Sequence, residues 1–306
     1  MQILTSWFKK DEHQKINKIS KGVYLINKTF VLKEFTDRKK ALREEKVLRK
    51  IKSKKILIPE LFMTETGEYI VENNKRYYFL QKYIRCDKLD LKILMKNPNI
   101  IISIGEAISE MHLLLNGLEV DDVFSEYSFV KEIKNVFDGQ LKSYLDHEKE
   151  FYKDFLDRIK RLNFLPKQLI HRDIHLNNLI FKDNYIGFID YSLVEINHRI
   201  FDICYFVTSL LTENSMSIKD IIIVLKLLVQ GYLNINCLSN EEIVYIPEII
   251  LAILYIATSY FIRIKKYRQL ALDNINAIRI VEDNFSLLES FVNQELRIKG
   301  GSEVEN

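Results

Sequence analysis

The chain has 306 residues, of which 47% are hydrophobic and 28% charged, with only 9 Gly and 4 Pro, so collagen-like, low-complexity and largely disordered proteins are excluded. Its three cysteines lie far apart in the sequence, which predicts neither a disulfide framework nor a cysteine zinc site and favours a reducing compartment. Positive charge gathers in residues 1–86, which hold 21 Lys and Arg against 10 Asp and Glu, whereas residues 87–306 hold 24 against 32.

This charge distribution has two interpretations. The basic part could favour an anion such as a nucleotide phosphate and the acidic part a cationic ligand, or both could be solvated helix faces. No nucleic-acid motif accompanies the Lys-rich stretch Arg38–Lys55, so no nucleic-acid partner is expected. The N-terminus lacks the apolar stretch of a secretion signal, and the apolar run Ile249–Ile262 is shorter than the roughly 20 residues that span a membrane. We therefore expect a cytoplasmic protein with no membrane partner, in an oligomeric state that stays open.

Residues about 16–84 have the pattern of an antiparallel sheet that carries one helix. A hairpin is expected to join Val23–Ile26 to Thr29–Phe35 through an Asn-Lys turn. Apolar residues at helical spacing predict a helix over Arg38–Lys52. Three further strands are expected, at Leu61–Thr64, Glu68–Glu72 and Arg76–Ile84.

The rest of the chain is predicted to be mostly helical. One helix opens at Asn97-Pro98, and a long charged helical stretch covers Ser125–Leu162. Ser217 and Ser239 begin two further helices, each with an acid three residues on, and the last pattern runs to about Arg297. Two short β-like runs interrupt the helices, at Gln168–Ile170 and Leu179–Tyr191.

This layout predicts two lobes and a tail. Residues 1–84 are expected to form a nucleotide-binding N-lobe, 85–299 a catalytic and substrate-binding C-lobe, and 300–306 a polar tail. The linker falls near Gln81–Leu89. A crevice between two lobes is a common place for a ligand.

The segment Leu169–Phe206 carries the clearest chemical pattern. It contains His171 and Asp173, then Asn178, then Asp190 at the end of an apolar run, which is the H-x-D-x-x-x-x-N plus Asp pattern of the protein-kinase-like fold. Phosphoryl transfer needs a carboxylate near the attacking hydroxyl and metal ions on the phosphates. We expect Asp173 to accept the hydroxyl proton, and Asn178 and Asp190 to bind Mg²⁺ together with substrate phosphates.

The same segment resembles the aminoglycoside phosphotransferase family, whose relatives include kinases of choline, homoserine and other small hydroxyl compounds. The family pattern falls here on His171, Asp173, His175, Asn178, Asp190 and Asp202. The resemblance implies an α+β, protein-kinase-like two-lobed fold, with an antiparallel β N-lobe carrying one helix and a mainly α-helical C-lobe. It also implies a small-molecule kinase that uses ATP or GTP with Mg²⁺.

The resemblance also assigns N-lobe residues. Lys33 looks like the nucleotide lysine of the family, and its place on a strand with alternating neighbours allows its head either to face the crevice or to be solvated. Glu44 looks like the helix partner of this lysine, with Glu45 as the alternative. Gln81 and Tyr83 lie where the family has the hinge that grips adenine.

The other motif residues have alternative roles. His171 either buttresses the catalytic loop or takes part in acid–base chemistry with Asp173. His175 is a family-like second histidine or a packing residue. Arg172 stands where small-molecule kinases often have Gly; it either reads a phosphorylated loop, as in protein kinases, or pairs with a nearby acid. For Asp202 two roles coexist: it hydrogen-bonds the catalytic loop, as in the family, and it is an acid stabilised in the first turn of its helix.

Three functions fit this fold. A small-molecule kinase is the main interpretation. A protein kinase needs an activation segment with an A-P-E motif, and only Tyr191–Phe201 separates Asp190 from the next helix. The alternative is a non-catalytic, spore-coat-type nucleotide-binding module, although such a site has usually lost a key residue. A P-loop enzyme is excluded because the chain has no G-x-x-x-x-G-K-[ST].

The substrate is expected to be a small molecule. The stretch Glu119–Asp157 has 11 acids against 5 lysines and falls where the family inserts substrate-facing helices. This favours a cationic, amine-bearing alcohol as the acceptor.

Overall fold

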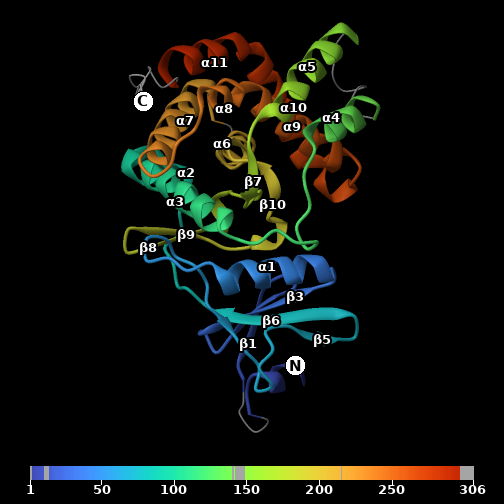
Figure 1. Ribbon diagram of the computed structural model, residues 1–306, viewed down its shortest axis with the longest axis vertical. Coiled ribbons are helices and arrows are strands. Elements are labelled where there is room, and N and C mark those ends of the chain that lie inside the picture. The colour runs from blue at the N-terminus through green and yellow to red at the C-terminus, as the bar shows by residue number, and fades with distance from the viewer. Residues whose placement is uncertain (1, 10–13, 140, 142–148, 215, 297–306) are drawn as a thin grey trace, which may run out of the picture.

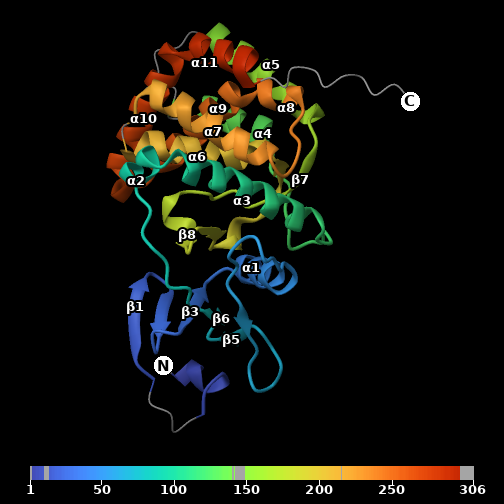
Figure 2. The same cartoon turned by 90° about the vertical axis from the view of Figure 1, so that its left-hand side faces the viewer.

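The computed structural model describes residues 2–9, 14–139, 141, 149–214 and 216–296 (Figure 1). The N-lobe is an antiparallel sheet with helix α1 (Arg38–Lys50) on the side facing the second lobe, and the C-lobe is mostly helical (Figures 1 and 2). The expected two-lobed α+β fold is therefore confirmed. The expected polar tail, 300–306, lies outside the described residues.

The N-lobe strands run in the order β1-β2-β3-β6-β4, and β5 also pairs with β6. They are β1 (Ile16–Ser20), β2 (Val23–Ile26), β3 (Phe30–Phe35), β4 (Leu61–Phe62), β5 (Val71–Asn73) and β6 (Arg76–Lys82). The predicted hairpin of β2 and β3 is confirmed, because Asn27 and Lys28 have the positive φ angles (52° and 58°) of a two-residue hairpin turn. The strand expected at Glu68–Glu72 is shifted, because the Gly67 N–H closes a turn onto the Thr64 carbonyl (3.0 Å) just before it.

The two faces of this sheet bury different clusters. Leu32 and Leu80 belong to an outer cluster with the N-terminal 3-10 turn. Phe79 points the other way and packs with Val47 of α1 in the main core. Lys33 follows Leu32 and pairs in register with Phe79, so its side chain shares the inner face.

Helices pack around α3 and α9 in the C-lobe. They are α2 (Leu91–Lys96), α3 (Pro98–Asn116), α4 (Phe129–Phe137), α5 (Lys149–Arg161), α6 (Ile200–Asn214), α7 (Ile218–Leu233), α8 (Asn240–Val244), α9 (Ile246–Ile262), α10 (Arg268–Asp283) and α11 (Phe285–Phe291), followed by a π-helical turn (Val292–Leu296). The predicted starts at Ser217 and Ser239 are confirmed, since each side chain accepts a backbone N–H of its helix. The long helical stretch expected over Ser125–Leu162 contains α4 and α5, and its residues 140 and 142–148 lie outside the described part.

Two short ribbons carry the segment between α5 and α6. Strand β7 (Lys167–Ile170) pairs with β10 (Glu195–His198), and β8 (Leu179–Lys182) pairs with β9 (Tyr185–Phe188). The sequence did not predict β10, because Glu195, Asn197 and His198 are polar residues that the fold nevertheless buries. Helix α2 was also not expected from the sequence.

The N-lobe and the linker both bind the β8–β9 ribbon through backbone bonds. The Leu57 N–H of the N-lobe donates to the Ile186 carbonyl (2.9 Å), and the Asp87 N–H of the linker donates to the Phe181 carbonyl (2.8 Å). A Cβ at Gly187 would lie 2.0 Å from the Leu57 oxygen, so this approach requires glycine. The ribbon between Asn178 and Asp190 is thus fixed to the N-lobe and to the linker. The exact domain boundary at residue 84 stays a prediction.

Across the described ranges of the chain, no helix is both long and apolar enough to cross a membrane.

Candidate active site

The catalytic loop links β7 to β8 and places Asp173 beside Asn178. The Asn178 amide nitrogen donates to the Asp173 backbone carbonyl (2.9 Å) and to the carboxylate Oδ2 (3.0 Å). The other carboxylate oxygen, Oδ1, accepts a hydrogen bond from the Tyr205 hydroxyl (3.0 Å). The Asp173 side chain keeps 20% of its surface exposed, so a ligand can still reach it.

Asp190 lies at the end of β9, next to this loop. The Ile189 N–H donates to the Asn178 carbonyl (3.0 Å), which sets the strand end against the loop. The Ser192 hydroxyl donates to Asp190 Oδ1 (2.7 Å), and Lys33 Nζ lies 3.4 Å from the same oxygen. Burial disfavours the charged carboxylate, but Lys33 and Ser192 outweigh it and lower the pKa of Asp190. Asp190 is therefore a charged oxygen donor beside a cation.

Lys33 forms a buried ion pair with Glu44 of α1, with 2.6 Å between Nζ and Oε1. Burial opposes the ammonium form, but Glu44 and Asp190 raise the pKa of Lys33, so it stays charged. Burial raises the pKa of Glu44 to about 7, against the effect of Lys33. The structure thus brings Lys33, Glu44 and Asp190 together. Glu45, the alternative partner, pairs with Arg49 instead.

Arg43 connects α1 to the turn that follows Asp190. Its Nη1 donates to the Ser192 carbonyl (3.0 Å), and its Nε and Nη2 donate to the Val123 carbonyl (3.3 and 3.1 Å). The guanidinium is buried, so these bonds fix the helix that carries Glu44 relative to the C-lobe.

Asp202, in the first turn of α6, holds the backbone of the catalytic loop. Its carboxylate accepts the backbone N–H groups of His171 (2.8 Å) and Arg172 (2.7 Å). His112 Nε2 donates to the same carboxylate (2.9 Å), and its Nδ1 accepts from the Tyr232 hydroxyl (3.0 Å). Asp202 thus both hydrogen-bonds the loop and is the acid in the first turn of its helix, which are the two roles expected to coexist.

His171 is a buried part of the loop's support. Its Nε2 donates to the Ile189 carbonyl (3.1 Å), and its Nδ1 accepts the Asp173 N–H (3.3 Å). Its ring lies 4.9 Å from that of Tyr191, between centroids. Burial lowers the pKa of His171, so the neutral ring persists at pH 7. Both ring nitrogens are engaged, which favours the buttressing role over acid–base chemistry.

Arg172 adopts a left-handed backbone with φ of 71°, a conformation that glycine takes without strain. This explains why small-molecule kinases often have Gly at this position. The Arg172 guanidinium donates to Glu195 (2.8 Å) and lies over the Tyr127 ring, 4.5 Å from its centroid. Of the two expected roles, its contacts fit a pair with a nearby acid.

Tyr205 is the site residue that sequence reasoning missed. A signal was available, because Tyr205 follows Asp202 by three residues and so shares its helix face. His175 lies further from the carboxylate, with 3.9 Å between its Nε2 and Asp173 Oδ2. Its Nδ1 is buried without a hydrogen-bond partner among the described residues.

Gln81 and Tyr83 lie at the end of β6. Gln81 pairs in register with Val31, two residues from Lys33, so it lies on the same inner face. Its Oε1 is buried and has no hydrogen-bond partner in the described part of the chain. The Tyr83 backbone N–H donates to the Thr29 carbonyl (2.7 Å), which uses this donor within the sheet. Nucleotide contacts of both residues stay predictions.

A metal site made only of protein side chains is not found: no group of three or more His, Cys, Asp and Glu among the described residues could hold an ion. The oxygens of Asn178 and Asp190 nevertheless fit a cation that also binds phosphates, because Mg²⁺ usually takes one or two carboxylates plus substrate oxygens. The Asn178 nitrogen is used by Asp173, which leaves its amide oxygen for a cation.

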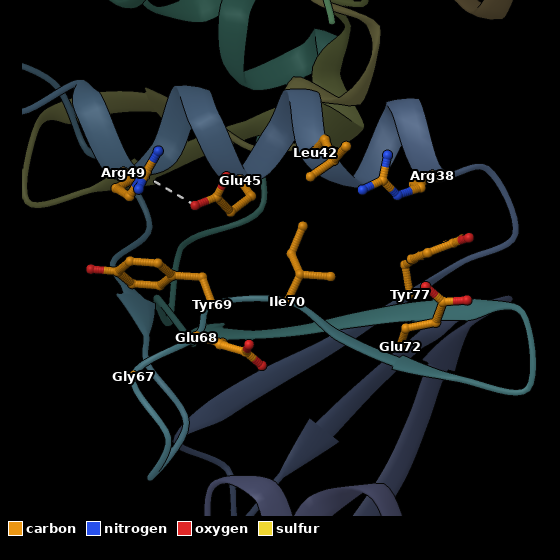
Figure 3. Close-up of a pocket in the computed structure, with 10 residues that line it drawn as sticks. All are labelled: Arg38, Leu42, Glu45, Arg49, Gly67, Glu68, Tyr69, Ile70, Glu72 and Tyr77. Carbon is orange, nitrogen blue, oxygen red and sulfur yellow. Dashed lines mark ion pairs between the residues drawn. The ribbon is translucent and has the colours of Figure 1, made fainter.

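A cavity of about 450 Å³ lies away from these residues, between α1 and the segment around β5 (Figure 3). Leu42 and Glu45 face it from the helix, and Tyr69 and Ile70 face it from the other wall. Glu44, next to Glu45 in the sequence, reaches Lys33 instead. The cavity therefore lies behind the helix and outside the candidate active site.

Several acids of the stretch Glu119–Asp157 are paired within the protein. Asp121 pairs with Lys46, and Glu126 with Lys167. The acidic excess that suggested a cationic substrate is therefore partly neutralised by the fold.

Solved structures of kinases share this architecture at low sequence identity. Amicoumacin kinase in complex with AMP-PNP aligns with a TM-score of 0.71 and 14% identity over 94% of this chain and 91% of its own. The GDP complex of aminoglycoside 2′-phosphotransferase-IIIa aligns with a TM-score of 0.67 and 13% identity over 92% and 97%. A choline/ethanolamine kinase family protein from Mesorhizobium loti aligns with a TM-score of 0.64 and 11% identity over 93% of each chain. These likenesses define the class of fold, the two-lobed kinase-like fold.

The sequence itself gives the family. Residues 15–227 match the phosphotransferase enzyme family (APH), and because this is more than half of the chain, the chain belongs to that family. A comparison with curated proteins finds no significant match. The predicted family and kinase-like fold are confirmed, and the chain is a phosphotransferase that acts on a hydroxyl group.

Proposed function

We propose that this kinase transfers the γ-phosphoryl group of ATP or GTP to a hydroxyl of a small, amine-bearing molecule in a Mg²⁺-dependent reaction, with Asp173 as the base. The proposal rests on two contacts between four side chains. Lys33 pairs with Asp190, and the Asn178 amide donates to the Asp173 carboxylate. Phosphoryl transfer requires these residue types, at the nucleotide phosphates and at the acceptor hydroxyl.

The N-lobe side of the site would bind the nucleotide. Lys33 is charged and held by Glu44, so its ammonium would bind phosphate oxygens without first losing a partner. The buried Gln81 Oε1, on the same sheet face, is an acceptor available to the base of the nucleotide.

Asn178 and Asp190 would hold Mg²⁺ together with the phosphates. Bound there, the metal neutralises the charge of the phosphates during transfer. The chain's own part is to orient the two ligands: Ser192 and Lys33 fix Asp190, and the Asp173 carboxylate fixes the Asn178 amide.

Asp173 would accept the proton of the acceptor hydroxyl. Each carboxylate oxygen has two lone pairs, and each already accepts one hydrogen bond, from Asn178 or from Tyr205. One lone pair on each oxygen is left for the acceptor, and the exposed part of the side chain gives access to it.

A carboxylate on the helix that carries Tyr205 would favour an amine on the acceptor. Glu213 is an exposed residue on α6, about 12 Å along the helix axis from Tyr205. An amine bound between Asp173 and Glu213 would lie within one Debye length, about 8 Å, of both carboxylates. One solved neighbour is named as an aminopropanol kinase, and its TM-score with this chain is 0.63. An amino alcohol is therefore the acceptor class to test first.

The test is acceptor-dependent release of nucleoside diphosphate, with the phosphate ester detected by mass spectrometry. Each amino alcohol or amino sugar is paired with the same alcohol without its amine. We expect turnover with the amine-bearing member of a pair. In Glu213→Gln the KM of this amine-bearing acceptor should rise several-fold, because an exposed charge contributes up to about 1 kcal/mol to binding. The exposed Glu241, on α8, supplies the control variant Glu241→Gln.

Equal turnover with both members of every pair would contradict the preference for an amine but not the kinase activity. Nucleotide binding without transfer to any acceptor would contradict the kinase proposal and favour the non-catalytic module.

A further inference from the structure

One hydrogen bond at the catalytic loop has no counterpart in the motif that defines the site. The Tyr205 hydroxyl donates to Asp173 Oδ1 at 3.0 Å. We propose that Tyr205 is a positioning residue, whose hydroxyl holds the Asp173 carboxylate in the orientation that accepts the acceptor's proton. This inference rests on the proposed function of Asp173 as the base.

The two oxygens of Asp173 are held from opposite sides. Asn178 donates to Oδ2 from within the loop, and Tyr205 donates to Oδ1 from α6. The terminal torsion of an aspartate is a soft, broad one, so a single donor leaves the carboxylate free to rock. Two donors on different oxygens fix its rotation and thereby the direction of the remaining lone pairs.

Tyr205 is itself well placed to act as a fixed donor. Its ring stacks on that of Phe201, with 5.8 Å between centroids and an interplanar angle of 19°. It lies one turn after Asp202, which holds the backbone of the same loop. Helix α6 therefore fixes the loop twice, through its backbone and through its catalytic side chain. Burial and the Asp173 carboxylate raise the pKa of Tyr205, which keeps its hydroxyl protonated.

Removing this hydroxyl takes one of the two donors from the carboxylate. The carboxylate loses part of its orientation, so fewer bound acceptors meet a correctly directed lone pair. The nucleotide would bind at Lys33 and Asp190, which Tyr205 does not contact, so its binding should not change.

The experiment compares Tyr205→Phe with wild type in acceptor-dependent turnover. We expect kcat to fall roughly tenfold to a hundredfold, as for a lost hydrogen bond to a charged group. The KM of the acceptor should change far less than kcat, while Mg²⁺-dependent nucleotide binding stays unchanged. In an Asp173→Ala background, Tyr205→Phe should cause no further loss, because the pair acts as a unit.

The matched control is Tyr255→Phe, which removes another buried tyrosine hydroxyl that donates to a carboxylate, Glu282 of α10. It should leave kcat close to that of wild type. The positioning role is overturned if Tyr205→Phe has wild-type kcat, or if its loss adds in full to that of Asp173→Ala. Wild-type turnover is measured first, so a failure of the proposed kinase function is seen separately.

Discussion

At the scale of single residues, two non-glycine residues of the site adopt a left-handed backbone. Arg172 has a φ of 71° and Asp190 a φ of 66°. This conformation costs about 1–2 kcal/mol for a residue with a Cβ. Side-chain contacts offset the cost: Arg172 pairs with Glu195, and Asp190 pairs with Lys33. Strain is thus stored at both ends of the candidate site, as is common at functional sites.

A pair of substitutions separates the strain of Arg172 from its ion pair. Arg172→Ala and Arg172→Gly both remove the guanidinium, but only glycine takes the positive φ without cost. We expect Arg172→Gly to be more stable than Arg172→Ala by about 1 kcal/mol in urea unfolding. Equal stabilities, or a more stable alanine variant, would contradict a strained backbone at this position.

Asp190 allows a test of the metal-binding role by a change of charge alone. Asp190→Asn keeps the shape of the side chain but removes the anionic ligand that a hard cation prefers. We expect nucleotide affinity with Mg²⁺ to fall at least about tenfold, or 1.4 kcal/mol, while affinity without Mg²⁺ changes less. Isothermal titration with and without Mg²⁺ measures both. Wild-type affinity that does not depend on Mg²⁺ would refute the role.

At the scale of elements, α3 and α7 approach closely enough to bring backbone against backbone. A Cβ added at Gly231 would lie 2.0 Å from the Ile102 carbonyl oxygen, and one at Gly105 would lie 2.2 Å from that of Leu228. This packing positions His112 of α3 and Tyr232 of α7, which together hold Asp202. The glycines therefore act on the catalytic loop through two packed helices.

Substituting Gly231 tests this close approach. Gly231→Ala should force the helices apart and destabilise the fold by about 1–3 kcal/mol, the usual cost of overpacking. Gly117→Ala is the control, because its Cβ would meet the Leu114 oxygen at 3.5 Å, an ordinary contact. Thermal unfolding measures both variants. A Gly231→Ala protein as stable as wild type would show that the helices separate without cost.

Elements with a strong local pattern could be predicted from the sequence, and those that depend on burial could not. The β2–β3 turn and the helix starts at Ser217 and Ser239 have side chains that stabilise them locally. Strand β10 has mostly polar residues, and it forms because β7 and Arg172 supply partners from elsewhere in the chain. Local propensity carries no information on such partners.

At the scale of the whole molecule, the site residues that are close in sequence could be predicted, and those brought together only by the fold could not. Asp173, Asn178 and Asp190 are close in sequence, so their spacing was sufficient to propose a common site. The contact of Arg43 with Ser192 joins residues 149 positions apart, and it depends on how the two lobes meet. Tyr205 was missed for a related reason, because only the docking of α6 on the catalytic loop brings its hydroxyl to Asp173.

The proposed mechanism gives nucleotide binding and phosphoryl transfer to different residues. The N-lobe lysine and the Asp190 strand end would bind the nucleotide, whereas Asp173 would act only on the acceptor. Removing the Asp173 carboxylate should therefore remove transfer and leave nucleotide binding in place, since the Asp173 backbone carbonyl still accepts from the Asn178 amide (2.9 Å) and the pair of Lys33 and Asp190 is untouched.

The most direct measurement is thus Asp173→Ala, assayed in parallel for Mg²⁺-dependent nucleotide affinity and for acceptor-dependent turnover. We expect the affinity to stay within about twofold of wild type and kcat to fall roughly 10²–10⁴-fold, the usual contribution of a general base. Turnover close to that of wild type with a true acceptor would contradict the assignment of Asp173 as the base.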